Sequence, residues 1–253
     1  MQNKTWLFSP LPSTTGFLFS AIAVIALSSS AQASNLVLNG SFEDVGSASA
    51  SFSVNNPTVL PDWAASPSGS KILDCLVLSG ATTDLCGSAF GGGFQFWTDP
   101  GASPDGGNFF MADGDSDFST PLTQAISGLV SGQQYQVTFY QAAAQQSGFD
   151  GVTTERWQVS LDGDSQLSTL MNNANHGAVS WMSQVMTFTA TAATQTLSFM
   201  AVGTPSGQPP FVLLDGVAIN ALSEVPEPAT FMLIGLGLAG IPLARRTMKK
   251  RVG

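Results

Sequence analysis

The stretch Tyr135-Gln-Val-Thr-Phe139 alternates apolar and polar side chains at every position. Successive side chains of a β-strand point to opposite faces, so the three apolar residues share one face and the two polar residues share the other. The same alternation recurs in residues 157–161 and ends at Asp162-Gly163, a dipeptide typical of tight hairpin turns. Both stretches therefore predict antiparallel strands with one buried face.

Short runs of the same kind continue in both directions, separated by Gly, Asn, Asp, Ser and Pro, and no helical period of useful length appears among them. Further strands are expected at residues 35–38, 72–78, 94–97, 108–112, 122–126, 184–189, 196–202 and 211–219. The stretches 44–71 and 98–107 are rich in turn-forming residues and are expected to be loops. Roughly ten strands at this spacing predict an all-β fold, a sandwich of two sheets.

The first 33 residues are expected to be a signal peptide. Lys4 is the only basic residue before an apolar run from Phe17 to Leu27, and Ala31-Gln-Ala33 has the small-x-small pattern that signal peptidase cleaves. We expect cleavage before Ser34. The apolar run is too short to span a membrane, but the long segment before it leaves an uncleaved anchor as the alternative.

The last 29 residues, 225–253, contain three features in order. Val225-Pro226-Glu227-Pro228 is followed by an uncharged run, residues 229–244, and then by a basic cluster that begins with Arg245-Arg246. The run would make about 24 Å of helix, slightly less than the ~30 Å hydrocarbon core, so it is a marginal transmembrane helix with its basic end on the cytoplasmic side. The alternative is a buried helix of a soluble domain.

This tail resembles the PEP-CTERM sorting signal of Gram-negative bacteria, and the resemblance covers residues 225–253. It implies that an exosortase, a membrane-embedded cysteine protease, recognises and cleaves the chain near Pro-Glu-Pro. It also implies a secreted protein that is transiently anchored in the inner membrane and then reaches the cell surface or the extracellular matrix. Such proteins belong to bacteria that make exopolysaccharide.

The intervening residues 34–224 have the length of a single β-sandwich domain. Three segments in them resemble the jelly-roll sandwiches of galactose-binding-like domains, including family 4 carbohydrate-binding modules: Asn35-Leu-Val-Leu-Asn-Gly-Ser-Phe-Glu43, residues 122–135, and Leu213-Leu-Asp-Gly-Val217. The resemblance implies a structural Ca²⁺ ion held by Glu43 and Asp215, where the two terminal strands lie close together. Gly216 departs from the commoner Leu-Asp-Asp-Val and removes one possible ligand. The alternative is that Asp215 forms a turn with Gly216 and that Glu43 is solvated.

Charge is distributed unevenly along the chain, which has 8 basic and 17 acidic residues. Six of the basic residues lie in the two terminal segments, and Glu227 is the only acid outside residues 34–224, so this body carries 16 acids against Lys71 and Arg156, a net charge of −14. Such a body repels phosphate backbones, which excludes nucleic acid as a partner. An acidic surface instead attracts divalent cations.

The two cysteines, Cys75 and Cys86, lie close together in a chain that is expected to be exported. In an oxidising compartment we expect them to form a disulfide. The alternative, a metal site with two Cys ligands, would need more Cys or His residues, and His176 is the single histidine of the chain.

The motifs of common enzymes are nearly absent. With one histidine in a loop-like stretch, no Gly-x-Ser-x-Gly elbow and no HExxH motif, the chain has no candidate hydrolytic triad or zinc protease site. A pair of carboxylates at glycosidase spacing is always possible among so many acids, but nothing singles one out. Asp113, Asp115 and Asp117 begin like an EF-hand loop that lacks its Gly and its final Glu. We therefore predict that the protein is not an enzyme.

Aromatic side chains are the better clue to binding, because carbohydrate-binding proteins stack sugar rings on exposed Trp and Tyr faces. Trp157 is in phase with its apolar neighbours and is expected in the core, and Trp181 fits either place. Trp97 and Trp63 lie next to loops and are the predicted ligand-binding residues, although ordinary edge packing explains their positions equally well.

The sequence therefore predicts a secreted, non-catalytic carbohydrate-binding module in the exopolysaccharide or biofilm matrix. A structural matrix or surface-coat protein without sugar binding is the alternative. A glycoside-active enzyme and an ice-binding protein, the latter suggested by the threonines of residues 187–191, are the remaining readings.

Overall fold

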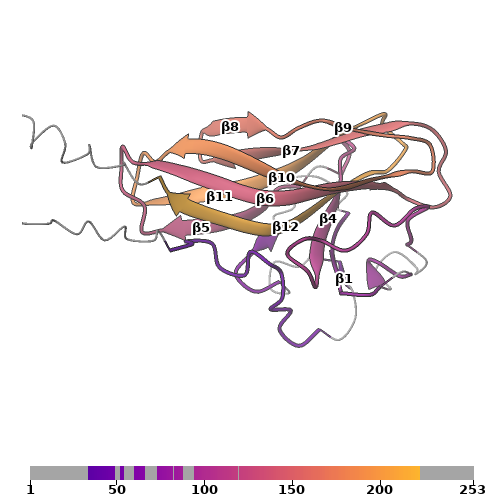
Figure 1. The fold of residues 1–253 in the computed structure, drawn as a ribbon, viewed down its shortest axis with the longest axis horizontal. Helices are drawn as coiled ribbons and strands as arrows, with labels where there is room; N and C mark the ends of the chain where they lie inside the picture. The colour runs from indigo at the N-terminus through magenta and orange to yellow at the C-terminus, as the bar shows by residue number, and fades with distance from the viewer. Residues whose placement is uncertain are drawn as a thin grey trace, which may run out of the picture. The chain divides into compact units, whose positions relative to one another are not determined.

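The computed structural model describes residues 34–48, 52–53, 60–65, 73–81, 83–87, 94–118 and 120–222. They form a sandwich of two antiparallel sheets (Figure 1), as the alternating pattern predicted. The predicted signal peptide and the predicted sorting tail lie outside the described residues. Within the described part of the chain, no helix has the length and apolar character that crossing a membrane requires.

The first sheet contains, in spatial order, β1 (Phe52–Ser53), β3 (Asp74–Val77), β4 (Phe109–Asp113), β12 (Pro210–Ala221), β6 (Gln134–Gln145) and β10 (Ala178–Thr189). The second sheet contains β2 (Ala64–Ala65), β5 (Leu122–Ser127), β11 (Thr194–Thr204), β7 (Thr153–Leu161) and β8 (Asp164–Leu167), and β9 (Met171–Asn173) pairs with β7. The long strands β6, β10 and β12 run side by side in Figure 1, which gives the first sheet a continuous surface.

The main core lies between the two sheets. The apolar residues of the 135–139 stretch, in β6, are buried there, and so are Trp157 and its in-phase neighbours in β7. The turn at Asp162-Gly163 joins β7 to β8, since Leu161 pairs with Asp164. Asp162 has a positive φ of 51°, a conformation that Asp tolerates better than most residues.

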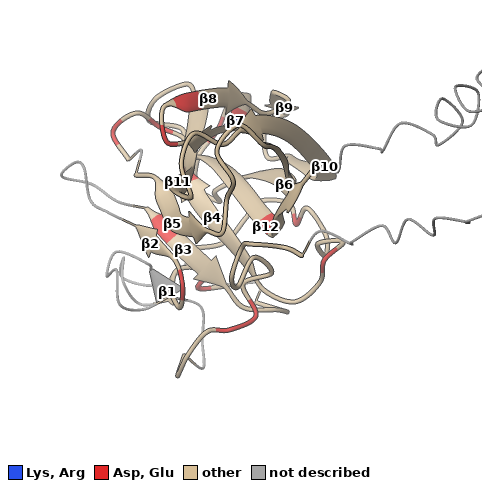
Figure 2. Ribbon diagram, turned by 90° about the vertical axis from the view of Figure 1, so that its left-hand side faces the viewer, with Lys and Arg blue, Asp and Glu red and all other residues tan. Residues whose placement is uncertain are grey.

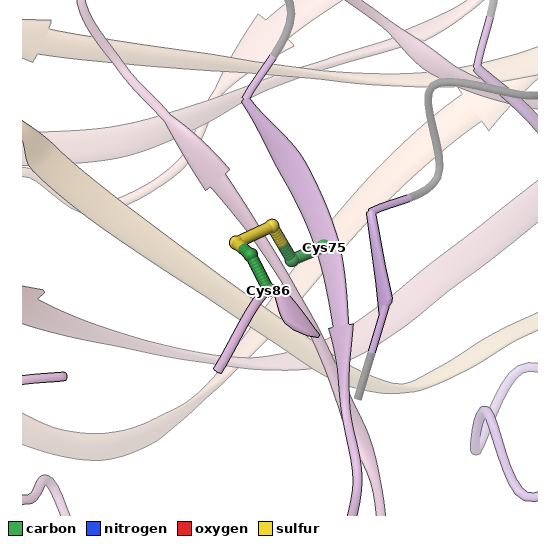
Figure 3. Close-up of a disulfide and its surroundings, with 2 residues drawn as sticks. All are labelled: Cys75 and Cys86. Carbon is green, nitrogen blue, oxygen red and sulfur yellow. A yellow bond between two sulfur atoms is a disulfide. The ribbon is translucent and has the colours of Figure 1, made fainter. Parts of the chain in front are cut away.

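A second apolar cluster covers the outer face of the first sheet. It contains Cys75, Met111, Ala142, Phe211 and Leu213, whose side chains point away from the main core. The chain segment after β3 lies over this face, and the disulfide between Cys75 and Cys86 ties it to the sheet (Figure 3). The predicted disulfide is therefore confirmed. The described part of this covering segment, residues 79–81, 83–87 and 94–107, forms most of the candidate site.

The structure differs from the predicted strands at several places. β6 extends to Gln145 through Ala142–Ala144, because both faces of the first sheet are covered there and no alternation marks the strand. Residues 35–38 are not a strand, since the Asn35 side chain accepts hydrogen bonds from the backbone N–H groups of Val37 and Ile219. The strand expected at 94–97 is reduced to one bridge, between Phe96 and Gln146.

Four short strands were not predicted from the sequence. They are β1, β2, β8 and β9, of two to four residues each. A strand of this length has too few residues to show a period. Two of them, β1 and β2, fall in the stretch 44–71 that was expected to be a loop.

Candidate functional site

A cavity of about 410 Å³ lies between the covering segment and the first sheet. Its described wall is formed by residues of the segment between β3 and β4 and by Phe109, the first residue of β4. The segment contributes Ser79, Gly80, Ala81, Leu85, Phe96, Trp97, Asp99, Gly101, Ala102, Ser103 and Gly107. The wall thus combines aromatic rings with a few polar groups and one carboxylate. This composition is typical of small-ligand sites.

Trp97 is the exposed aromatic residue of this cavity, with 43% of its surface accessible. Its indole Nε1–H donates a hydrogen bond of 2.8 Å to the carbonyl of Phe149, and its backbone N–H donates to the carbonyl of Gln145 at 3.0 Å. The ring of His176 lies on the indole, with centroids 4.1 Å apart and planes 31° apart. Trp97 is therefore a fixed ring that is supported by a second ring and still exposed to solvent.

His176 is held by polar contacts on three sides. Its backbone N–H donates to the side-chain oxygen of Gln145 at 2.6 Å, and its carbonyl accepts a hydrogen bond from the Thr98 hydroxyl at 2.8 Å. Its ring Nε2 lies 2.5 Å from a carboxylate oxygen of Asp150. The sequence placed His176 in a loop but gave no sign of its stacking on Trp97, because the two residues are far apart along the chain.

Trp181 supports the same loop from the sheet. It lies in β10, and its indole N–H donates a hydrogen bond of 2.8 Å to the carbonyl of Gly101. Its ring also packs edge-on against Phe109, with centroids 5.5 Å apart. Trp181 therefore fixes the position of residues 99–103, which form one wall of the cavity.

Trp63 does not form an exposed platform, which corrects the prediction from sequence. It is only 3% exposed, contacts Phe42 and Phe199 in the main core, and donates its indole N–H to the carbonyl of Asn39 at 3.0 Å. Trp63 lines a shallow hollow of about 580 Å³, but the faces of its ring are buried. The turn at Asp62 directs the side chain inward, and turn residues in the sequence do not reveal that direction.

The two residues predicted to bind calcium lie in the same neighbourhood. Asp215 is fully buried in β12, and one of its carboxylate oxygens has no hydrogen-bond partner, while the other accepts the N–H of Gly216 at 2.8 Å. Burial raises the pKa of Asp215 to about 7; hydrogen bonds from Ser103 and Gly216 oppose the shift, and the negative charges of Asp105 and Glu43 add to it.

Glu43 and Asn108 fix the other side of this neighbourhood. The Glu43 carboxylate accepts hydrogen bonds from the backbone N–H of Asn108 at 2.8 Å and from its side-chain amide at 3.3 Å. A side chain at Gly107 would collide with the Glu43 carboxylate, so the loop needs glycine there. Among the described residues, no three acidic, His or Cys side chains form a metal site by themselves. A cation would therefore also need carbonyl, hydroxyl or amide oxygens.

Gly216 is explained by backbone geometry. The pairing of β12 with β6 shifts register between Asp215 and Ala218, and Gly216 adopts a φ of 59° in this bulge. A Cβ at this position would lie 2.8 Å from the Tyr140 ring and 3.2 Å from the Asp105 side chain. A second aspartate, as in the related Leu-Asp-Asp-Val pattern, would be strained here.

The acidic run after β4 has a structural role. The Asp113 carboxylate accepts the N–H of Asp115, and the Asp115 carboxylate accepts the N–H groups of Asp117 and Gly207 and the Ser206 hydroxyl. These bonds connect the end of β4 to the turn between β11 and β12. Burial raises the pKa of Asp113 to about 7, and the adjacent Asp74 is also buried with its pKa raised well above the ordinary value.

Comparisons with known proteins add two sequence matches. Residues 224–251 match the model of the PEP-CTERM protein-sorting motif, and residues 108–220 match the model described as a protein of unknown function, DUF642. No curated protein matches the chain. The sorting motif bears out the first resemblance drawn from the sequence, and it indicates export to the cell surface or the extracellular space.

Solved structures show low overall similarity to the chain. TmCBM61, solved with β-1,4-galactotriose, is 15% identical with a TM-score of 0.43, and the match covers 75% of this chain and 99% of that one. The enzymatically active domain of bacteriophage CBA120 tailspike protein 4 is 14% identical with a TM-score of 0.38, covering 74% of this chain but only 21% of that one. A CBM4 structure is 15% identical with a TM-score of 0.34, covering 74% and 99%.

Residues 224–251 of the chain are thus a PEP-CTERM protein-sorting motif, and residues 108–220, within its β-sandwich, match the DUF642 family.

Proposed function

We propose that the protein is a non-catalytic glycan-binding module that acts in the extracellular polysaccharide layer, after an exosortase has processed its tail. The observation that carries this proposal is the Trp97 ring, held rigidly by His176 and the Phe149 carbonyl at an open cavity of about 410 Å³. A rigid aromatic platform binds a sugar ring at low entropic cost, because neither the indole nor its supports must be ordered on binding.

The polar groups around Trp97 suit a hydroxyl-rich ligand. Ser79, Asp99 and Ser103 line the same cavity and offer donors and acceptors to sugar hydroxyls. Among the described residues that line the cavity there is one carboxylate and no histidine, whereas glycoside hydrolysis uses a pair of carboxylates. This composition supports binding over catalysis.

A glycan array tests the proposal. Wild-type protein should be retained by at least one class of glycan, and the Trp97→Ala variant should lose that retention. Leu167→Ala is the matched control, since Leu167 is an exposed apolar residue on β8 of the other sheet. Equal retention of wild type and Trp97→Ala would contradict the proposal, and so would the absence of retention by every glycan.

The proposal includes a structural Ca²⁺ ion at Glu43 and Asp215, with backbone carbonyl oxygens and water as the further ligands. Support comes from the buried, unpartnered oxygen of Asp215 and from the two negative charges close to it. A hard cation takes carboxylate and carbonyl oxygens and would offset the mutual repulsion of these acids. Ser103, which contacts Asp215, also lines the glycan cavity, so the cation would stabilise one cavity wall.

Thermal melts in calcium and in chelator test the cation site. At about 100 times its dissociation constant, calcium should add about 2.7 kcal/mol, or roughly 5–11 °C for a domain of this size. The double variant Glu43→Gln plus Asp215→Asn should lose this shift, while Asp164→Asn, an exposed acid on β8, should keep it. Identical wild-type curves in the two conditions would rule the site out.

A further inference from the structure

The glycan cavity carries negative charge in addition to its exposed aromatic ring. Asp99 lies in the same wall as Trp97 and is exposed. One of its carboxylate oxygens accepts the N–H of Gly101 at 2.9 Å, which fixes the side chain, and a carboxylate has capacity for further donors. The cavity therefore places a fixed anion beside an exposed indole.

The surroundings of the cavity are also negative. The Glu43 carboxylate lies against Gly107, which lines the cavity, and accepts the N–H of Asn108. Asp215 is hydrogen-bonded to Ser103 of the cavity wall, and Asp105 and Glu43 are close enough to Asp215 to raise its pKa. Figure 2 shows acidic residues on several strands and loops of the sandwich. Among the described residues the only Lys or Arg is Arg156, which lies in β7 of the other sheet. His176 is the other basic group near the cavity, and Asp150 contacts its ring.

This arrangement discriminates between glycans by charge. A uronic acid or a sulfated sugar would bring an anion towards the Asp99 carboxylate, and among the described residues no Lys or Arg lines the cavity, so its approach costs electrostatic energy. A protonated amine would gain twice, because it is attracted by the carboxylate and by the face of the Trp97 indole. We propose that the cavity takes a glycan that contains a sugar with a free amino group, such as glucosamine. This inference rests on the proposed glycan-binding function and adds its substrate class.

Two oligosaccharides that differ only in acetylation test the inference. The full-length chain in a mild detergent is titrated calorimetrically at about pH 6 with a β-1,4-linked glucosamine tetramer, whose amines carry positive charge, and with the N-acetylated tetramer, which carries none. An uronic acid tetramer is the anionic comparison. We expect the amine form to bind about tenfold more tightly than the acetylated form at low salt, with the difference shrinking as salt is added, and no binding of the uronic acid tetramer.

Two charge-removing variants assign the effect to the cavity. Asp99→Asn should abolish the preference for the amine, because it should weaken binding of the glucosamine tetramer about tenfold more than binding of the acetylated tetramer. Asp164→Asn removes the same charge from an exposed position on β8 and should keep the preference. Equal binding of the two tetramers by wild type, or tighter binding of the acetylated or uronic form, would overturn the inference while leaving glycan binding intact. If wild type bound none of the tetramers, and no glycan on an array either, the proposed function itself would fail.

Discussion

At the scale of single residues, two tryptophans next to loops in the sequence have opposite roles in the structure. Trp63 fills the main core and makes its hydrogen bond inside the protein, whereas Trp97 lies at a cavity and is partly exposed. Sequence neighbours identify a loop but do not determine which way a side chain points. The contact between Trp97 and His176 cannot be inferred from the sequence either, because it joins loops that are far apart in the chain.

The two tryptophans should respond differently to truncation. Trp63→Ala should lower the free energy of unfolding by about 3–5 kcal/mol, because it leaves a large cavity in the core. Trp97→Ala should lower the unfolding free energy by only about 1 kcal/mol, because the indole is partly exposed and belongs to neither apolar cluster. Denaturant titrations of both variants measure the difference. A Trp97→Ala variant as unstable as Trp63→Ala would mean that Trp97 is a structural residue.

Buried carboxylates should make the protein less stable at neutral pH than at mildly acidic pH. The pKa values of Asp113, Glu155 and Asp215 are raised to about 7, mainly by burial, whereas in the unfolded chain such groups titrate near pH 4. The folded state thus holds more protons between these values, so the free energy of unfolding should fall as pH rises from about 4 to about 7, by roughly 1 kcal/mol per pH unit for each group.

Urea titrations in chelator over this pH range measure the slope. Asp215→Asn keeps the shape of the side chain but cannot ionise, so its slope should be shallower than that of wild type. Asp164→Asn, on the exposed strand β8, should leave the slope unchanged. A wild-type protein whose stability rises steadily over the same range would contradict the assignment of these carboxyl groups as proton-binding in the folded state.

At the scale of elements, the covering segment links the sheet to the cavity. The Cys75–Cys86 disulfide holds it at one end, and the hydrogen bond from Trp181 to Gly101 holds it in the middle. The sequence predicted the disulfide from two nearby cysteines and the expected export, but it did not predict that the bonded segment covers a second apolar face. The continuous apolar run in β6 was the available signal, because a strand covered on both sides loses its alternation.

Removing the disulfide should destabilise the domain. Closing a loop of 11 residues contributes about 3 kcal/mol in the chain-entropy estimate, equivalent to roughly 6–12 °C in melting temperature for a domain of this size. Melting curves of Cys75→Ala plus Cys86→Ala, compared with wild type in the presence and absence of reductant, measure the effect. If reductant lowered the melting temperature of the double variant as much as that of wild type, the loss could not come from this disulfide.

At the scale of the whole molecule, the alternation of apolar and polar residues predicted the two-sheet sandwich and most of its long strands. The tail was identified by the Pro-Glu-Pro motif, the uncharged run and the basic cluster that follow one another in that order. Strands β1, β2, β8 and β9 escaped prediction because two to four residues carry no period. The cavity could not be predicted from the sequence for another reason. Its wall combines the segment between β3 and β4 with Phe109 of β4, and only folding brings Trp97 of this wall into contact with His176.

The sorting motif should be required for release of the sandwich from the inner membrane. Two prolines in Pro226-Glu227-Pro228 restrict the backbone to extended conformations, which suits recognition by a protease. Replacing these three residues by alanine should leave the full-length protein in the inner-membrane fraction, as judged by fractionation and immunoblotting. A control with alanine at the exposed residues Thr191, Thr194 and Thr196 should be sorted normally. Normal processing of the motif variant would contradict the exosortase assignment.

If a sugar contacts the exposed ring of Trp97, as we propose, the indole N–H resonances of ¹⁵N-labelled protein report on that contact directly. The signal of each tryptophan is assigned by its Trp→Phe variant, and the protein is then titrated with the glycan that it retains most strongly on the array. We expect a saturable shift of the Trp97 signal, with the buried Trp63 and Trp157 signals unmoved. Saturable glycan binding that leaves the Trp97 signal in place would contradict the proposal.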